Sequence, residues 1–268
     1  MKHAGWIERK MLVKFFSHIP AVLMLCLSLV LQGFAGEDIR HERIEIQANG
    51  FTMPATLSLP VGAGPFPAVL ILPGGNTSKL MGIAWPHHHL LADNLCKHGY
   101  ATLVLNYSNK DRQLLDAPRI ADIGAALDYL KTRNEIEETQ INLLGLSMGG
   151  SLGLMVAGTR TDVAHLVTFF APIKNPEVKK GPLDMVKTIA CPVLILQGDQ
   201  DEVTEPTQAK ALHDALTAAG KDAKLVVYKG AGHGFTYKDA PKAPCCRYDS
   251  TLTAKSIEEV DAFLRRKN

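Results

Sequence analysis

The chain has 268 residues, of which 46% are apolar, with 29 Lys and Arg against 27 Asp and Glu. Four of the basic residues and one acidic residue lie within residues 1–35, so the remaining chain has a net charge of −1. This balance excludes the basic surface that nucleic-acid-binding proteins need, and the apolar content is sufficient for one large core.

The first 35 residues are predicted to be an export signal. A stretch with four Lys or Arg residues precedes an apolar run over residues 19–31, and Gly33-Phe34-Ala35 supplies small residues before a cleavage site. The alternative is an uncleaved membrane anchor, because residues 15–35 contain no charged side chain. We therefore expect residues 36–268 to form a single domain that is periplasmic or secreted, or is held at the membrane by this segment.

The exported part begins with a predicted β-hairpin. Residues 43–47 and 52–59 have the composition of strands, and Asn49-Gly50 between them is a hairpin turn signal.

Strands and helices then alternate along the chain. The predicted strands are short, β-branched and without a polar face, at residues 68–72, 102–105, 141–144, 166–170, 193–196 and 225–228. Helical periodicity marks residues 120–130, 206–220 and 257–263. The pattern predicts an α/β fold with a mostly parallel sheet, an N-terminal antiparallel hairpin and helices on both faces. Functional groups are then expected in loops at the carboxyl ends of the strands.

Gly145-Leu146-Ser147-Met148-Gly149 follows one of these strands and precedes an apolar, small-residue helix. A Gly-x-Ser-x-Gly pattern alone is weak evidence, and a glycine-rich turn without chemistry is the alternative. Its place between a strand and a helix predicts a nucleophile elbow, in which the glycines leave room for a sharp turn. Ser147 is therefore the predicted nucleophile.

A serine nucleophile needs a base and a carboxylate that orients it. His233, in the small-residue run 230–235 after the last predicted strand, is the predicted base. Three carboxylates follow the strand 193–196, and we choose Asp201, with Asp199 as the second choice and Glu202 facing solvent or capping a helix. The order Ser, Asp, His is that of α/β-hydrolases.

An oxyanion hole completes this chemistry. We expect one donor to be the backbone N–H of Met148 and the other to be that of Gly75 or, as a second choice, Asn76, in the loop after residues 68–72.

The Gly145–Gly149 elbow, Gly198-x-x-Asp201 and Gly232-His233-Gly234-Phe235 together resemble the dienelactone hydrolase family of α/β-hydrolases. The resemblance covers residues 52–266 and implies a hydrolase of esters or lactones without a large lid domain. Two positions depart from it. The namesake enzymes have a cysteine nucleophile and an acidic residue after the third strand, whereas this chain has Ser147 and Gly74.

Other features have simpler interpretations. Trp85-Pro86-His87-His88-His89 is interpreted as a helix start rather than a metal site, because adjacent helical residues do not face one site. Cys245-Cys246 is the better disulfide candidate, whereas Cys96 and Cys191 lie in apolar surroundings. The aromatic residues near the predicted site are interpreted equally well as pocket lining or as core; they are Tyr107, Phe235 and Tyr237.

We therefore expect an exported serine hydrolase that needs no cofactor or metal. It is expected to have no nucleic-acid partner, and no membrane partner beyond export or a possible N-terminal anchor. Its predicted substrate is a small-molecule ester or lactone. A prolyl-oligopeptidase-like peptidase or an acyltransferase would use the same triad. The alternative from another class is a non-catalytic binding protein with a hydrolase fold, which a broken triad would indicate.

Overall fold

A computed structural model describes residues 39–48, 50–75, 78–106, 117–174, 181–238 and 246–266, without the side chains of residues 51, 78–87, 117 and 118. The predicted export signal lies outside these residues. Ile39–Asn268 forms one unit by its internal contacts. None of the helices in these ranges is long and apolar enough to cross a bilayer.

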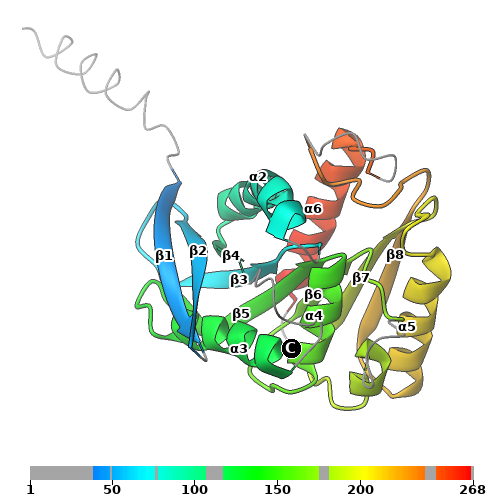
Figure 1. The fold of residues 1–268 in the computed structure, drawn as a ribbon, viewed down its shortest axis with the longest axis horizontal. Helices are drawn as coiled ribbons and strands as arrows, with labels where there is room; N and C mark the ends of the chain where they lie inside the picture. Colours follow the sequence, from blue (N-terminus) through cyan, green and yellow to red (C-terminus); the bar gives the residue numbers. More distant parts are fainter. Residues whose placement is uncertain are drawn as a thin grey trace, which may run out of the picture. The chain divides into compact units, whose positions relative to one another are not determined.

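One sheet of eight strands organises this unit (Figure 1). Its spatial order is β1-β2-β4-β3-β5-β6-β7-β8. The strands are β1 Arg40–Ala48, β2 Phe51–Leu59, β3 Phe66–Leu72, β4 Ala101–Leu105, β5 Ile136–Leu146, β6 Leu166–Phe169, β7 Val193–Gly198 and β8 Ala223–Tyr228.

The first two strands form the predicted antiparallel hairpin, with Ala48 opposite Phe51 across the turn. Gly50 in that turn has φ 77°, a left-handed conformation that glycine adopts without steric cost. β2 pairs antiparallel with β4, and every later pairing is parallel. The predicted α/β-hydrolase architecture is confirmed.

Helices cover both faces of the sheet (Figure 1). α3 Ala117–Lys131, α4 Met148–Ala157 and α5 Pro206–Ala218 pack on one face, and α2 Ser78–Lys97 and α6 Ser250–Leu264 on the other. A short 3₁₀ helix, η1 Pro182–Met185, contacts α4. Side chains alternate between the two cores, so that Leu70 and Leu72 face the first set of helices while Val69 and Ile71 face the second.

Three sequence predictions are corrected at this level. β5 begins at Ile136, five residues before the expected start. Phe170 lies beyond β6 with φ 39°, outside the strand conformation expected for it. Residues 85–89 lie inside α2, which begins at Ser78, and therefore do not mark a helix start. A proline and three histidines in that segment obscured the helical pattern.

Candidate active site

Ser147 occupies the sharp turn between β5 and α4. Its φ of 51° and ψ of −120° are rare for a residue with a side chain. Such backbone strain costs about 1–3 kcal/mol, and interactions in the surrounding structure have to offset this cost. A Cβ on Gly145 would lie 2.2 Å from the carbonyl oxygen of Gly149, and one on Gly149 would lie 1.9 Å from that of Leu72. Both positions therefore require glycine, and the backbone of α4 rests directly on the end of β3.

A line of hydrogen bonds runs from Ser147 through His233 to Asp201. The Oγ of Ser147 lies 3.0 Å from His233 Nε2, and His233 Nδ1 lies 3.0 Å from Asp201 Oδ2. Nδ1–H can donate to the carboxylate while Nε2 accepts from the hydroxyl. His233 and Asp201 are only 6% and 3% exposed, so little water competes for these contacts.

The carboxylate of Asp201 is held by further donors. Oδ1 accepts hydrogen bonds from the backbone N–H groups of Val203 and Thr204, at 2.9 and 2.7 Å, and Oδ2 accepts one from Gln197 Nε2 at 3.0 Å. Burial by itself would raise the pKa of Asp201, but the hydrogen bond and charge of His233 and the other donors outweigh it, so the pKa is lowered. The side chain is therefore a carboxylate at neutral pH.

Asp199 and Glu202, the other two candidate acids, do not contact His233 in this way. Asp199 Oδ1 accepts a hydrogen bond from the backbone N–H of Gly230 at 2.6 Å, which ties β7 to the loop carrying His233. Glu202 is exposed to solvent. Among these three residues, the structure brings Asp201 to the histidine.

The predicted oxyanion donors belong to two segments next to Ser147. Met148 is the first residue of α4, and the N–H groups of a first helical turn have no acceptor within the helix. Gly75 follows β3 with φ 88°, and its neighbour Gly74 lies against the Cβ of Ser147. Asn76, the second choice, lies outside the described residues.

An aromatic cluster supports the imidazole. The Phe170 ring lies 4.8 Å from that of His233, centroid to centroid, and also contacts Phe235 and Tyr237. Phe235 is fully buried, as in the core-packing interpretation, whereas Tyr107 lies outside the described residues.

Sequence reasoning missed both Phe170 and Gln197. A buried glutamine at the end of an otherwise apolar strand was the available signal for Gln197.

Within the described ranges, His, Cys, Asp and Glu form no group of three that could hold a metal ion. His88 is buried against the ring of Tyr237. Cys96 and Cys191 are free, buried thiols. Cys245 lies outside the described residues, so a disulfide of Cys245 or Cys246, with each other or with different partners, stays a prediction.

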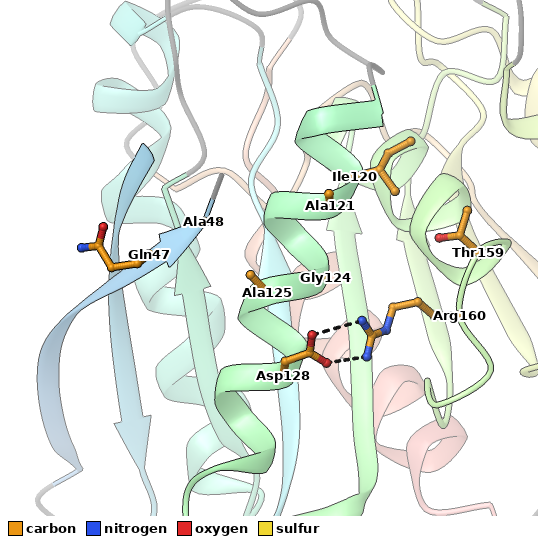
Figure 2. Close-up of a pocket in the computed structure, with 9 residues that line it drawn as sticks. All are labelled: Gln47, Ala48, Ile120, Ala121, Gly124, Ala125, Asp128, Thr159 and Arg160. Atoms are coloured by element: carbon orange, nitrogen blue, oxygen red, sulfur yellow. Dashed lines mark hydrogen bonds and ion pairs between the residues drawn. The ribbon is translucent and has the colours of Figure 1, made fainter. Parts of the chain in front are cut away.

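A cavity of about 700 Å³ lies away from the triad (Figure 2). Its walls come from the end of β1, from α3 and from the residues after α4, and the Asp128–Arg160 ion pair crosses one side of it. No residue of the triad lines it.

The strand order and the elbow together define an α/β-hydrolase. The sequence profile of the Dienelactone hydrolase family matches residues 53–267, and the chain belongs to this family of enzymes.

Two curated relatives and one solved structure show the range of similar proteins. A probable 2-oxo-3-(5-oxofuran-2-ylidene)propanoate lactonase of a Bradyrhizobium species is 26% identical, over 81% of this chain and 94% of its own. Acyl-coenzyme A thioesterase 1 of Rattus norvegicus is 34% identical over 72% of this chain, which spans 53% of that protein. The structure of a dienelactone hydrolase-like promiscuous phosphotriesterase from metagenomic libraries shares the fold, with a TM-score of 0.71, 21% identity and coverage of 85% and 98% of the two chains.

Proposed function

We propose that this protein is a serine hydrolase that cleaves a carboxylic ester or lactone of a small molecule through an acyl-enzyme on Ser147. The observation that carries the proposal is the hydrogen-bond line from Ser147 Oγ to His233 and on to the buried Asp201 carboxylate. The lactonase relative supports the choice of substrate class.

The first half of the reaction is acylation. His233 Nε2 accepts the proton of Ser147 as Oγ attacks the carbonyl carbon, and the carbonyl π electrons move to its oxygen. The N–H groups of Met148 and Gly75 stabilise this oxyanion. The tetrahedral intermediate collapses, the bond to the alkoxide breaks, and the imidazolium of His233 protonates the leaving oxygen. Asp201 stabilises the imidazolium in both steps.

Deacylation repeats these steps with water as the nucleophile. His233 takes a proton from the water, the hydroxide adds to the acyl carbon, and collapse returns the proton to Ser147 Oγ. The acid is released. With a lactone, the leaving hydroxyl stays attached to the acyl chain, so the product is a single hydroxy acid.

Labelling with a fluorophosphonate probe tests the nucleophile. The wild type should label and Ser147→Ala should not. Ser151→Ala is the matched control: this serine is one turn further along α4, its hydroxyl donates to the Pro172 carbonyl, and the variant should still label. A folded wild-type protein that does not label would contradict the proposal.

Substrate panels test the leaving group. Short p-nitrophenyl esters and aliphatic lactones should be hydrolysed, and the activity should disappear in Ser147→Ala. Turnover of peptide p-nitroanilides without turnover of esters or lactones would overturn the substrate class while leaving the nucleophile in place.

We further propose that the protein acts outside the cytoplasm, on the basis of residues 1–35. Fractionation of a Gram-negative host that expresses the full chain, with N-terminal sequencing of the product, tests this. A cytoplasmic product that retains Met1 would contradict it.

A further inference from the structure

Tyr237 connects the loop that carries His233 with the nucleophile. Its backbone N–H donates to the Gly234 carbonyl at 2.8 Å, in a turn directly after the histidine. Its ring meets that of Phe170 edge-on, at 5.6 Å and 87°, and Phe170 is also the ring against which His233 packs. The conformations of Tyr237 and His233 therefore depend on the same aromatic support.

The hydroxyl of Tyr237 lies beside Gly74. A Cβ on Gly74 would be 2.7 Å from Tyr237 Oη and 3.0 Å from Ser147 Cβ. The hydroxyl thus occupies the space that a side chain at position 74 would fill, directly beside the nucleophile. This oxygen is shielded from solvent, so it belongs to the packed surroundings of Ser147.

We propose that Tyr237 is a positioning residue for the oxyanion hole. Its hydroxyl supports Gly74 and thereby sets the place of the adjacent Gly75 N–H relative to Ser147 Oγ. The inference rests on the proposed function. An oxyanion donor has to lie within about 2.7–3.1 Å of the developing charge, and a displacement near 1 Å can cost on the order of a hundredfold in rate.

The same contact accounts for the glycine at position 74. Any side chain there would displace the phenol or the nucleophile, so Gly74 and Tyr237 form a matched pair. The acidic side chain that the namesake enzymes carry at this position has no space here. The wall beside the nucleophile is therefore formed by an uncharged phenol instead of a carboxylate.

Tyr237→Phe tests the role of the hydroxyl, because it removes one atom and keeps the ring on Phe170. We expect kcat for p-nitrophenyl acetate to fall about tenfold or more, as the donor is misplaced in the transition state. KM should change less than about twofold, because the hydroxyl is not proposed to contact the bound substrate. A residue with only a structural role would lower the melting temperature without this change in kcat.

Tyr228→Phe is the matched control. Tyr228 is also a buried tyrosine, 5.2 Å from Phe235 between ring centroids, but its hydroxyl is not among the three atoms nearest to a Cβ at position 74. Its kcat should equal that of the wild type.

A double-mutant cycle with Gly74→Ala tests the pairing. Gly74→Ala alone should lower kcat more than the same substitution does in a Tyr237→Phe background, since loss of the hydroxyl gives the new methyl group room. Unchanged kcat in folded Tyr237→Phe would overturn the inference, and so would fully additive effects. Fluorophosphonate labelling separates the two proposals: a wild type that does not label overturns the function itself, whereas a wild type that labels and tolerates Tyr237→Phe overturns only this inference.

Discussion

Gln197 donates its side-chain N–H to the Asp201 carboxylate at 3.0 Å and to the carbonyl oxygen of Thr204 at 3.1 Å. It thus connects the end of β7 to both sides of the turn that carries the acid. Because Gln197 is buried, no water can replace these hydrogen bonds if the amide is lost. The position of Asp201 therefore depends on a residue outside the triad.

Gln197→Met should weaken both stability and catalysis. The change keeps the volume but removes one donor from the Asp201 carboxylate and one from the Thr204 carbonyl, so we expect a loss of about 1–3 kcal/mol in the free energy of unfolding. We also expect kcat to fall, because Asp201 holds His233 less well. Urea unfolding and steady-state kinetics measure the two effects. Gln208→Met is the control: that amide oxygen accepts from the N–H groups of Ile173 and Lys174, so its loss should affect stability without lowering kcat.

Two neighbouring acids should differ sharply on substitution. Asp201→Asn should lower kcat by about 10⁴-fold, since the amide favours the wrong tautomer of His233. Asp199→Asn should cost far less, because Asp199 only accepts from the backbone N–H of Gly230. Kinetics of the two purified variants decide the assignment, and a larger loss in Asp199→Asn would show that Asp201 is the wrong acid.

The lowered pKa of Asp201 has a consequence for the pH profile. A carboxyl whose pKa is lower in the folded protein contributes stability above its unfolded pKa and loses it only as pH falls through the folded value. Asp201 therefore stays ionised at pH values at which an unfolded aspartate would already have taken up its proton, so it adds no second proton to the acid side of the activity profile. The acid side of log kcat/KM against pH should fall with the slope of a single proton. A two-proton slope would contradict this account.

The contact between Gly149 and β3 predicts a difference between two glycines of α4. Gly149→Ala should prevent folding or displace the elbow, because its Cβ would meet the backbone carbonyl of Leu72 at 1.9 Å. Gly153→Ala, one turn later, would meet only the ends of the Leu166 and Leu72 side chains, at 3.0 and 3.8 Å. Alanine is favoured over glycine in a helix by about 1 kcal/mol. Thermal unfolding of the two variants should show a large loss for the first and little or none for the second.

The two buried thiols should resist alkylation. Burial and the nearby charge of Asp93 raise the pKa of Cys96 to about 12, and burial raises that of Cys191 to about 11. Since the thiolate is the reactive form, iodoacetamide at neutral pH should not modify either residue in the native protein. Peptide mapping by mass spectrometry measures the alkylated fraction of each cysteine, with urea-unfolded protein as the positive control. Rapid modification of Cys96 in the folded state would show that its surroundings open readily.

Much of the fold could be predicted because the strands are short apolar runs between helical segments. The hairpin, the parallel strands and the elbow all follow from patterns within about ten residues. The boundaries were less predictable. β5 extends back through the polar residues 137–140 because they lie at the exposed end of the strand, where hydropathy carries no signal.

The geometry of the candidate site could be predicted where chemistry demands a residue type after a strand. Ser147, His233 and Asp201 lie within hydrogen-bond distance of one another along the chain Ser-His-Asp, and their catalytic roles stay predictions. The supporting residues could not be predicted in the same way. The contact of Phe170 with His233 depends on a left-handed backbone turn, and that of Tyr237 with Gly74 depends on how two distant loops approach. Neither has a signature in local sequence.

The close approach of Gly149 to Leu72 fixes the turn at Ser147 through main-chain atoms alone. The backbone conformation of this turn therefore does not depend on which atom the side chain at position 147 carries. An oxygen or a sulfur at this position would extend from the same Cβ, with the sulfur slightly further out because a C–S bond is longer than a C–O bond. The same backbone can thus carry a serine or a cysteine nucleophile. Exchanging one for the other would alter the reactivity of the enzyme without changing how the core packs.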